Sequence, residues 1–111
     1  MAAPALDLHV ASKSGGNSTL RLTGDEGTYT FGGGYNVDNA DPAVIMIPDQ
    51  MVSRVHCSLS WSEDIGWMLA DLAGTNGTFV NGHLITAPVL LQSGGTFRIG
   101  GSVVRVEDRK S

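Results

Sequence analysis

The sequence predicts an all-β fold, a β-sandwich of two antiparallel sheets, and two observations lead to that prediction. Apolar residues alternate with polar ones along short segments, which is the period-two pattern of half-buried strands. Turn-forming residues separate the segments, and 15 of the 111 residues are glycine. A chain of this length suits one modest core, so we expect a single domain over residues 1–111 with its core at about 5–107.

The alternating segments follow one another along the whole chain. They lie at residues 6–10, 20–22, 29–31, 44–47, 55–61, 67–69, around 79, 97–99 and 104–106. Within 55–61, the spacing predicts that Val55, Cys57 and Leu59 share one face of a strand and that His56 points to the other. Glycine-containing turn signals fall between segments, at 14–17, 62–66, 76–77 and 81–82, because Asn and Gly tolerate positive φ.

Composition argues against several classes of function. The formal net charge is −4, from seven lysines and arginines against eleven acidic residues, whereas a general nucleic-acid binder is usually basic. The cations are scattered along the chain, at Lys13, Arg21, Arg54, Arg98, Arg105, Arg109 and Lys110. No apolar run approaches the roughly 20 residues of a membrane span. We therefore expect no nucleic-acid or membrane partner, and an intracellular location, either nuclear or cytoplasmic.

Cys57 is the only cysteine, which excludes an internal disulfide and a cysteine-rich metal site. Its place in an alternating apolar segment predicts a buried thiol. His9 and His83 have no metal-ligand spacing and are predicted to lie on the surface. We expect no metal and no cofactor.

Four segments carry a more specific pattern. Residues 53–56 read Ser-Arg-Val-His, and residues 76–82 read Asn-Gly-Thr-Phe-Val-Asn-Gly. Upstream, residues 29–32 read Tyr-Thr-Phe-Gly, and downstream, residues 91–100 run from Leu to Gly around a Gly-Gly pair. Together these segments resemble the forkhead-associated (FHA) family over almost the whole chain.

The resemblance implies a β-sandwich of the SMAD/FHA type that binds phosphothreonine peptides with loops at one end. The residues that it assigns to the peptide site are Met51, Ser53, Arg54, Gly74, Thr75 and Asn76. Ser53 matches a donor to the phosphate, Thr75 matches a group that lines the phosphothreonine pocket, and Asn76 matches the asparagine that binds the peptide main chain. Arg54 falls where a cation or amide often lies near the phosphate, and Met51 where the third residue after the phosphothreonine is read. The residues that match loop-shaping or loop-bracing positions are Gly32, His56, Gly77 and Asn81.

The chemistry of these residue types suits an anion. A phosphate group offers three strong acceptor oxygens and nearly two negative charges. Hydroxyl groups at Ser53 and Thr75 and backbone N–H groups near Gly74 would supply donors, and an arginine would add charge-assisted bonds. On residue types alone, Ser53 is also compatible with a turn cap, and residues 75–78 with an ordinary hairpin turn.

One position departs from the family pattern. The resemblance places an arginine, the main phosphate ligand, where this chain has Gly33, and residues 22–53 contain neither lysine nor arginine. A hydrogen bond to a charged group contributes about 1.5–3 kcal/mol, so its loss is expected to weaken binding about 10- to 100-fold. Arg54 or exposed N–H groups of Gly32–Gly34 are partial remedies, although these glycines read more simply as a flexible turn. If the rest of the pocket is competent, Gly33→Arg is expected to raise phosphopeptide affinity about tenfold or more.

The sequence therefore predicts a protein-interaction module that recognises phosphothreonine peptides with weakened phosphate affinity. The alternative is a degenerate domain that acts as a phosphate-independent scaffold or oligomerisation module. Nucleophilic catalysis by Ser53 and His56 is not expected, because positions three apart on a strand point to opposite faces and no acid is spaced to orient the histidine. We expect a binding domain and not an enzyme.

Overall fold

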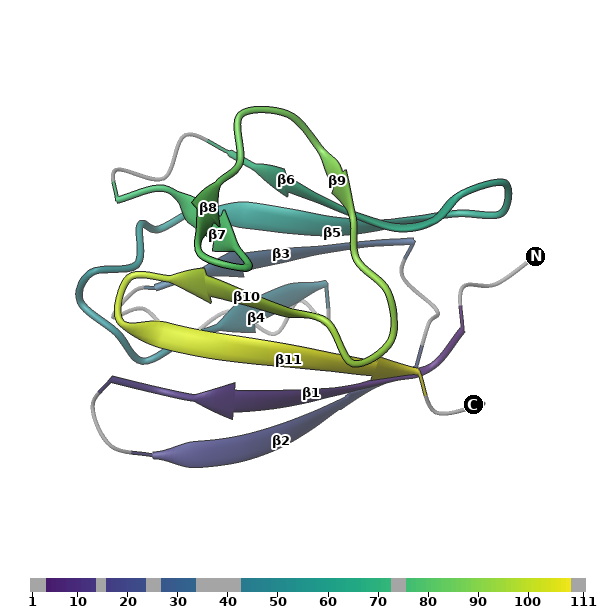
Figure 1. Ribbon diagram of the computed structural model, residues 1–111. Helices are drawn as coiled ribbons and strands as arrows, with labels where there is room; N and C mark the ends of the chain where they lie inside the picture. Colours follow the sequence, from purple (N-terminus) through teal and green to yellow (C-terminus); the bar gives the residue numbers. More distant parts are fainter. Residues whose placement is uncertain (1–3, 14–15, 24–26, 34–42, 73–75, 109–111) are drawn as a thin grey trace.

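The computed structural model describes residues 4–13, 16–23, 27–33, 43–72 and 76–108, whose regular elements are all strands (Figure 1). In chain order these are β1 (Leu6–Ala11), β2 (Asn17–Leu22), β3 (Thr28–Gly32), β4 (Val44–Met46), β5 (Cys57–Ser62), β6 (Gly66–Asp71), β7 (Thr78–Val80), β8 (His83–Leu84), β9 (Val89–Leu90), β10 (Thr96–Ile99) and β11 (Ser102–Asp108). Among the described residues there is no helix with the length and apolar character needed to cross a bilayer.

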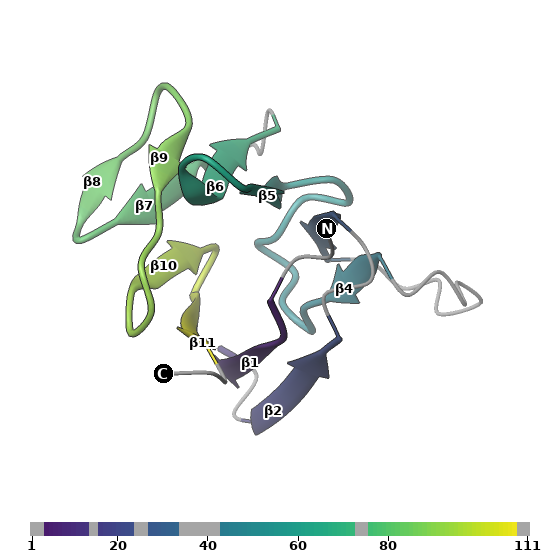
Figure 2. The same cartoon turned by 90° about the vertical axis from the view of Figure 1, so that its right-hand side faces the viewer.

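The strands form two sheets, which confirms the predicted sandwich. One sheet has six strands in the order β2-β1-β11-β10-β7-β8, and all of its pairs are antiparallel. The other has five strands in the order β4-β3-β5-β6-β9, and its β3–β4 pair is parallel. Figure 2 looks along the strands and shows the two layers edge-on.

The core lies between the two sheets and consists of the inward-facing residues of each strand. Its largest fully buried apolar side chains are Tyr29, Phe31, Phe97, Leu6, Leu8, Ile47, Leu59, Leu69, Ile99, Val104 and Val106. Phe31 of one sheet meets Phe97 of the other edge to face, with ring centroids 5.3 Å apart. The period-two pattern of the sequence thus places its apolar residues where the sheets meet.

Two details differ from the predicted strands. β5 begins at Cys57, and Val55 is 52% exposed on the preceding loop, whereas the alternation placed Val55 on the buried face. The pairing between β3 and β5 ends at the Phe31–Cys57 pair, and the residues that precede Cys57 belong to the β4–β5 loop. The two-residue strands β8 and β9 were not predicted, because a segment of that length is too short to show alternation.

The turns and loops lie at the two opposite ends of the sandwich. Asn81 and Gly82 both have positive φ, 53° and 80°, and they close the β7–β8 hairpin as their dipeptide predicts. The β4–β5 connection, the β10–β11 turn and Asn76–Gly77 lie at one end, at the left of Figure 1, which we call the loop end. The β5–β6 hairpin lies at the opposite end.

Candidate functional site

The connection between β4 and β5 is the longest described loop, and it packs directly onto the end of β3. The Gly33 N–H donates to the Ser53 carbonyl, and the His56 N–H donates to the Phe31 carbonyl, each at 2.9 Å. The Ile47 N–H also donates to the Gly32 carbonyl at 2.9 Å. These main-chain bonds attach both ends of the loop to the end of β3, and they fix the position of Ser53 relative to the sheet.

His56 connects this loop to the one that follows β6. Its side chain is fully buried. Nδ1 accepts the Ser53 N–H at 2.9 Å, and Nε2 lies 2.7 Å from the Gly77 carbonyl, to which it donates in the neutral tautomer that this pair of partners requires. Because both ring nitrogens are engaged by main-chain groups, His56 braces the loops and has no nitrogen left to act as a base on Ser53.

Asn76 makes a second connection between the same two loops. Its side-chain amide donates to the Met51 carbonyl at 2.7 Å, although Asn76 itself is exposed. This amide therefore already binds a main-chain carbonyl, which is the type of contact that the resemblance assigns to it toward a peptide. A peptide that took this amide would have to replace the bond to Met51.

Asp49 fixes the beginning of the loop, and it was not assigned a role from the sequence. One carboxylate oxygen accepts the Met51 N–H at 2.8 Å, as in an Asx turn. The other accepts the Gly101 N–H at 2.9 Å, from the β10–β11 turn, and the Ser102 hydroxyl at 2.6 Å, from the first residue of β11. The Asp-x-Met spacing signals the first bond, but the other two join residues about fifty positions apart and leave no local pattern.

These contacts also set the ionisation of Asp49. Burial by itself would raise the pKa of the carboxyl group. The hydrogen bonds to its oxygens and the charge of Lys13 outweigh burial, so the pKa of Asp49 lies below its ordinary value. The carboxyl group is therefore ionised at neutral pH, and its carboxylate form accepts the hydrogen bonds that hold the loop.

A buried polar contact also lies beneath the loops. Thr78, at the start of β7, is fully buried, and its hydroxyl donates to Asp71 at the end of β6 at 2.7 Å. Cys57 stands opposite Asp71 in the β5–β6 ladder. Burial, together with the Asp71 carboxylate, raises the pKa of the Cys57 thiol to about 12. The predicted buried thiol is confirmed, and it is protonated at neutral pH.

The structure brings together most of the residues that the sequence assigned to a peptide site. Ser53 is half-buried, Arg54 is exposed and Met51 is 45% exposed, all on one loop that contacts Asn76. Gly74 and Thr75 lie outside the described residues. Within the part of the chain that the structure describes, no group of three or more His, Cys, Asp or Glu side chains could hold a metal ion.

Gly33 is crowded, which the sequence did not reveal. A Cβ atom at this position would lie 2.6 Å from the Val52 carbonyl oxygen and 2.8 Å from that of Asp49, and both are main-chain atoms. Gly32 is tighter still, because a Cβ there would overlap the Arg54 carbonyl. The interpretation of these glycines as a flexible turn does not describe Gly32 and Gly33, which are buried. Gly33→Arg would displace the loop that carries Ser53, so it is not the simple restoration that the sequence suggested.

Comparison with known proteins identifies the family. The FHA domain model matches residues 29–100 of this chain. FhaA, an FHA domain-containing protein of Mycobacterium tuberculosis, is 37% identical over 98 residues, which cover 84% of this chain and 18% of FhaA. The chain therefore belongs to the FHA family, whose domains are protein-interaction modules.

Solved structures agree with this assignment. The FHA domain of CT664 from Chlamydia trachomatis matches with a TM-score of 0.74 at 26% identity, over 94% of this chain and 97% of that one. An FHA domain solved to analyse phosphothreonine-dependent FHA interactions matches with a TM-score of 0.66 at 31% identity, over 93% and 95% of the two chains. Three of the curated relatives are much longer proteins, and this chain spans 10–18% of their length.

Proposed function

We propose that this domain binds phosphothreonine-containing protein segments through the loop end. Ser53 and Arg54 contact the phosphate, together with Gly74 and Thr75, and Asn76 binds the peptide main chain. Met51 contacts a side chain that follows the phosphothreonine. The phosphothreonine dependence of a relative with 31% identity supports this proposal. The activity is binding alone, without a covalent step.

One observation carries the proposal. His56 bonds the Ser53 N–H with one ring nitrogen and the Gly77 carbonyl with the other, so a single buried side chain sets the spacing of the two loops. The exposed Asn76 is the neighbour of Gly77, and the exposed Arg54 is the neighbour of Ser53. The spacing of the two loops is thus set before any ligand arrives, which lowers the ordering cost of binding, and Asn76 exchanges its bond to Met51 for one to the peptide.

Phosphate affinity is expected to be reduced relative to a domain that has an arginine at position 33. One charge-assisted ligand is missing, which corresponds to about 10- to 100-fold weaker binding. Arg54 is exposed and makes no ion pair with any described residue. In this proposal Arg54, the neighbour of Ser53, takes over part of that role.

A titration followed by NMR tests the proposal. The labelled domain is titrated with a degenerate phosphothreonine peptide pool and with the same pool unphosphorylated. We expect phosphate-specific shifts at Ser53, Arg54 and Asn76, and at least tenfold weaker binding by Ser53→Ala and Asn76→Ala. Ser18→Ala and Gln92→Ala, at exposed positions away from these loops, serve as matched controls. Unchanged phosphopeptide binding by both site variants would contradict the proposal.

A second candidate is a scaffold or oligomerisation module that needs no phosphate. The crowding at Gly33 favours it, because the loop fills the space from which an arginine side chain would start. It predicts equal affinity for phosphorylated and unphosphorylated partners. It also predicts that Arg54→Gln leaves affinity unchanged, whereas the leading proposal predicts a loss of about tenfold for the phosphorylated peptide alone.

A further inference from the structure

The outer face of the six-stranded sheet carries one continuous row of side chains at the loop end. Register pairs place Leu84 of β8 opposite Phe79 of β7, Phe79 opposite Arg98 of β10, and Arg98 opposite Val103 of β11. Leu84 is 55% exposed and Val103 is 39% exposed. The Arg98 guanidinium lies over the Phe79 ring at 4.4 Å. We call these four residues the outer row.

The rest of this face, farther from the loop end, is different in kind. There Glu107 lies 2.6 Å from His9 and 3.7 Å from Arg105, and Arg21 lies 3.9 Å from Asp7. Its charges are therefore paired with one another. Arg98, by contrast, has no carboxylate partner or side-chain hydrogen bond within the described residues, although it is exposed. The outer row thus combines exposed apolar atoms with an available cation.

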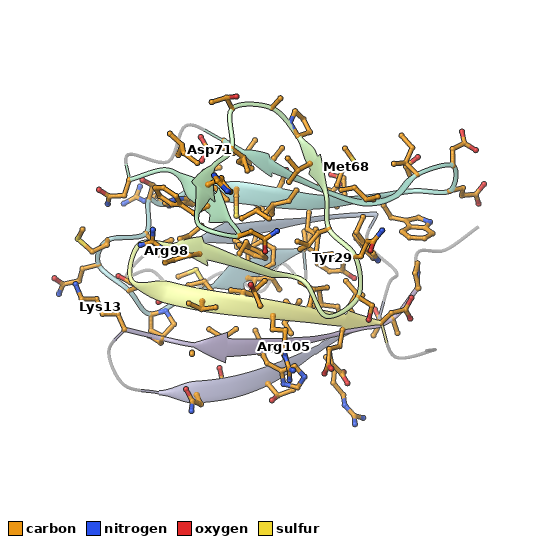
Figure 3. All side chains as sticks on the ribbon, in the orientation of Figure 1. Lys13, Tyr29, Met68, Asp71, Arg98 and Arg105 are labelled. Atoms are coloured by element: carbon orange, nitrogen blue, oxygen red, sulfur yellow. The ribbon has the colours of Figure 1, made fainter. Side chains whose placement is uncertain are left out.

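The outer row continues directly into the proposed binding loops. A Cβ atom on Gly77 would lie 2.5 Å from the Leu84 side chain and 3.6 Å from the Phe79 ring, so these side chains lie against the turn that carries Asn76. On the other side, the Lys13 side chain lies over Gly101 in the turn that leads into β11. Figure 3 shows Lys13 and Arg98 toward the loop end and Arg105 nearer the middle of the sheet.

The charges of the described residues favour an acidic occupant. At the loop end, Lys13, Arg54 and Arg98 are exposed, whereas the two described acids there, Asp49 and Asp71, are engaged in internal hydrogen bonds. Asp71 is partly exposed, and the other exposed or partly exposed carboxylates of the described residues lie away from the loop end, in the β5–β6 turn (Glu63, Asp64), at the start of β1 (Asp7) and at the end of β11 (Glu107, Asp108). The domain has a net charge of −4, yet its loop end presents cations.

We propose that the outer row binds the segment that flanks the phosphothreonine in the partner, and that this segment alternates acidic and aliphatic side chains. The inference rests on the proposed function, because the phosphothreonine site sets where the segment starts. Aliphatic side chains pack on Leu84 and Val103, and a carboxylate pairs with Arg98, whose stem stays on Phe79. Four strands span about 14 Å, so about five extended residues cover the row.

Matched peptides test this inference. A common phosphothreonine core is extended by Glu-Leu-Glu-Leu-Glu on its N-terminal side, on its C-terminal side, or by Gly-Ser repeats. We expect one acidic extension to bind about five- to tenfold more tightly than the Gly-Ser extension at low salt, and this ratio to fall with salt. NMR shifts are expected at the outer row with that extension only.

Variants assign the gain to the outer row. In Arg98→Glu and Leu84→Ser, the ratio of extended to Gly-Ser affinity is expected to fall to about one. Arg105→Glu, on the same face but farther from the loops, and Ile65→Ser, 58% exposed in the β5–β6 turn, are controls that should keep the ratio. Equal affinity of all extensions, or a ratio that survives Arg98→Glu, would overturn the inference.

A final arm separates this inference from the proposed function. The acidic extension is added alone, without the phosphothreonine core, at millimolar concentration. Shifts at the outer row without any phosphopeptide binding at Ser53 would support the outer row and contradict the phosphothreonine site. Phosphopeptide binding without an effect of the extension would support the phosphothreonine site and contradict the outer row. If neither the phosphopeptide nor the extension caused amide shifts, both proposals would be overturned.

Discussion

The two ends of the sandwich are held by different means. At the β5–β6 end, a hairpin closes on the regular ladder, and the Ile65 N–H donates to the Ser62 carbonyl inside its turn. Residues 63–65 of that turn are exposed. At the loop end, side chains replace the ladder. Of the five buried polar side chains in the described chain, all except Ser58 lie there.

The difference shows what it takes to hold a long irregular loop. A hairpin satisfies its backbone by strand pairing, and its turn side chains can face water. The β4–β5 loop has no strand partner over most of its length, so His56 and Asp49 supply hydrogen bonds that a ladder would otherwise provide. Each of these side chains is buried, and a buried group that loses its partner is costly. The loop end should therefore be the sensitive end, and three predictions test this.

The largest effect is expected from His56→Ala. It leaves the Ser53 N–H and the Gly77 carbonyl without their partner and opens a cavity, so we expect a loss of about 2–4 kcal/mol in the free energy of unfolding. Urea denaturation measures the change. His83→Ala, at an exposed histidine, should stay within about 0.5 kcal/mol. His56→Gln, whose amide can donate and accept, should recover part of the lost stability. If His56→Ala and His83→Ala lost equal stability, the loop end would not be the more sensitive end.

Gly33→Ala is expected to have the next largest effect. A Cβ atom would meet two main-chain carbonyl oxygens at 2.6 and 2.8 Å, and these can move only with the loop. We expect about 1–3 kcal/mol of destabilisation, together with amide shifts at Val52 and Ser53. Gly27→Ala is the matched control, since a Cβ there meets nothing within 4 Å. If both alanine variants were equally stable, Gly33 would not be crowded in solution.

The fold was predictable because its signal is local. The alternation of residues such as Leu6, Leu8 and Val10 follows from one buried sheet face, and it survives in the sequence without knowledge of the partner strand. The Asn81–Gly82 turn was predictable for the same reason, since positive φ is a property of the turn itself. Strand β4 runs parallel to β3, and nothing within β4 encodes that direction.

The candidate site was predictable only in part. Ser53, Arg54 and Asn76 were found through a family resemblance, and the structure places them on two contacting loops. The crowding at Gly33 depends on the approach of Val52, nineteen positions away, and the second carboxylate oxygen of Asp49 depends on Ser102. The outer row depends on the register between β7, β8, β10 and β11. Contacts of this kind appear only once the sheets are assembled.

Asp49→Asn is expected to have the smallest effect on the free energy of unfolding, and the pH dependence of this effect shows that it comes from the charge of Asp49. The folded-state pKa of Asp49 is lowered, so its contribution to stability is present above the unfolded-state value of about 3.9. That contribution is lost as the pH falls through the lower folded-state pKa. At pH 7 we expect the variant to be about 1–2 kcal/mol less stable, because an amide keeps only one acceptor for Met51, Gly101 and Ser102.

The difference between Asp49 and its asparagine variant should then shrink from about pH 5 downward. The remaining carboxylates are common to both proteins, so their effect cancels in the comparison. Asp64→Asn, at the exposed β5–β6 turn, is the matched control and should change the free energy of unfolding at pH 7 by no more than about 0.5 kcal/mol. A difference that stays constant from pH 7 to pH 3 would mean that the loop end is held by the shape of Asp49 and not by its charge.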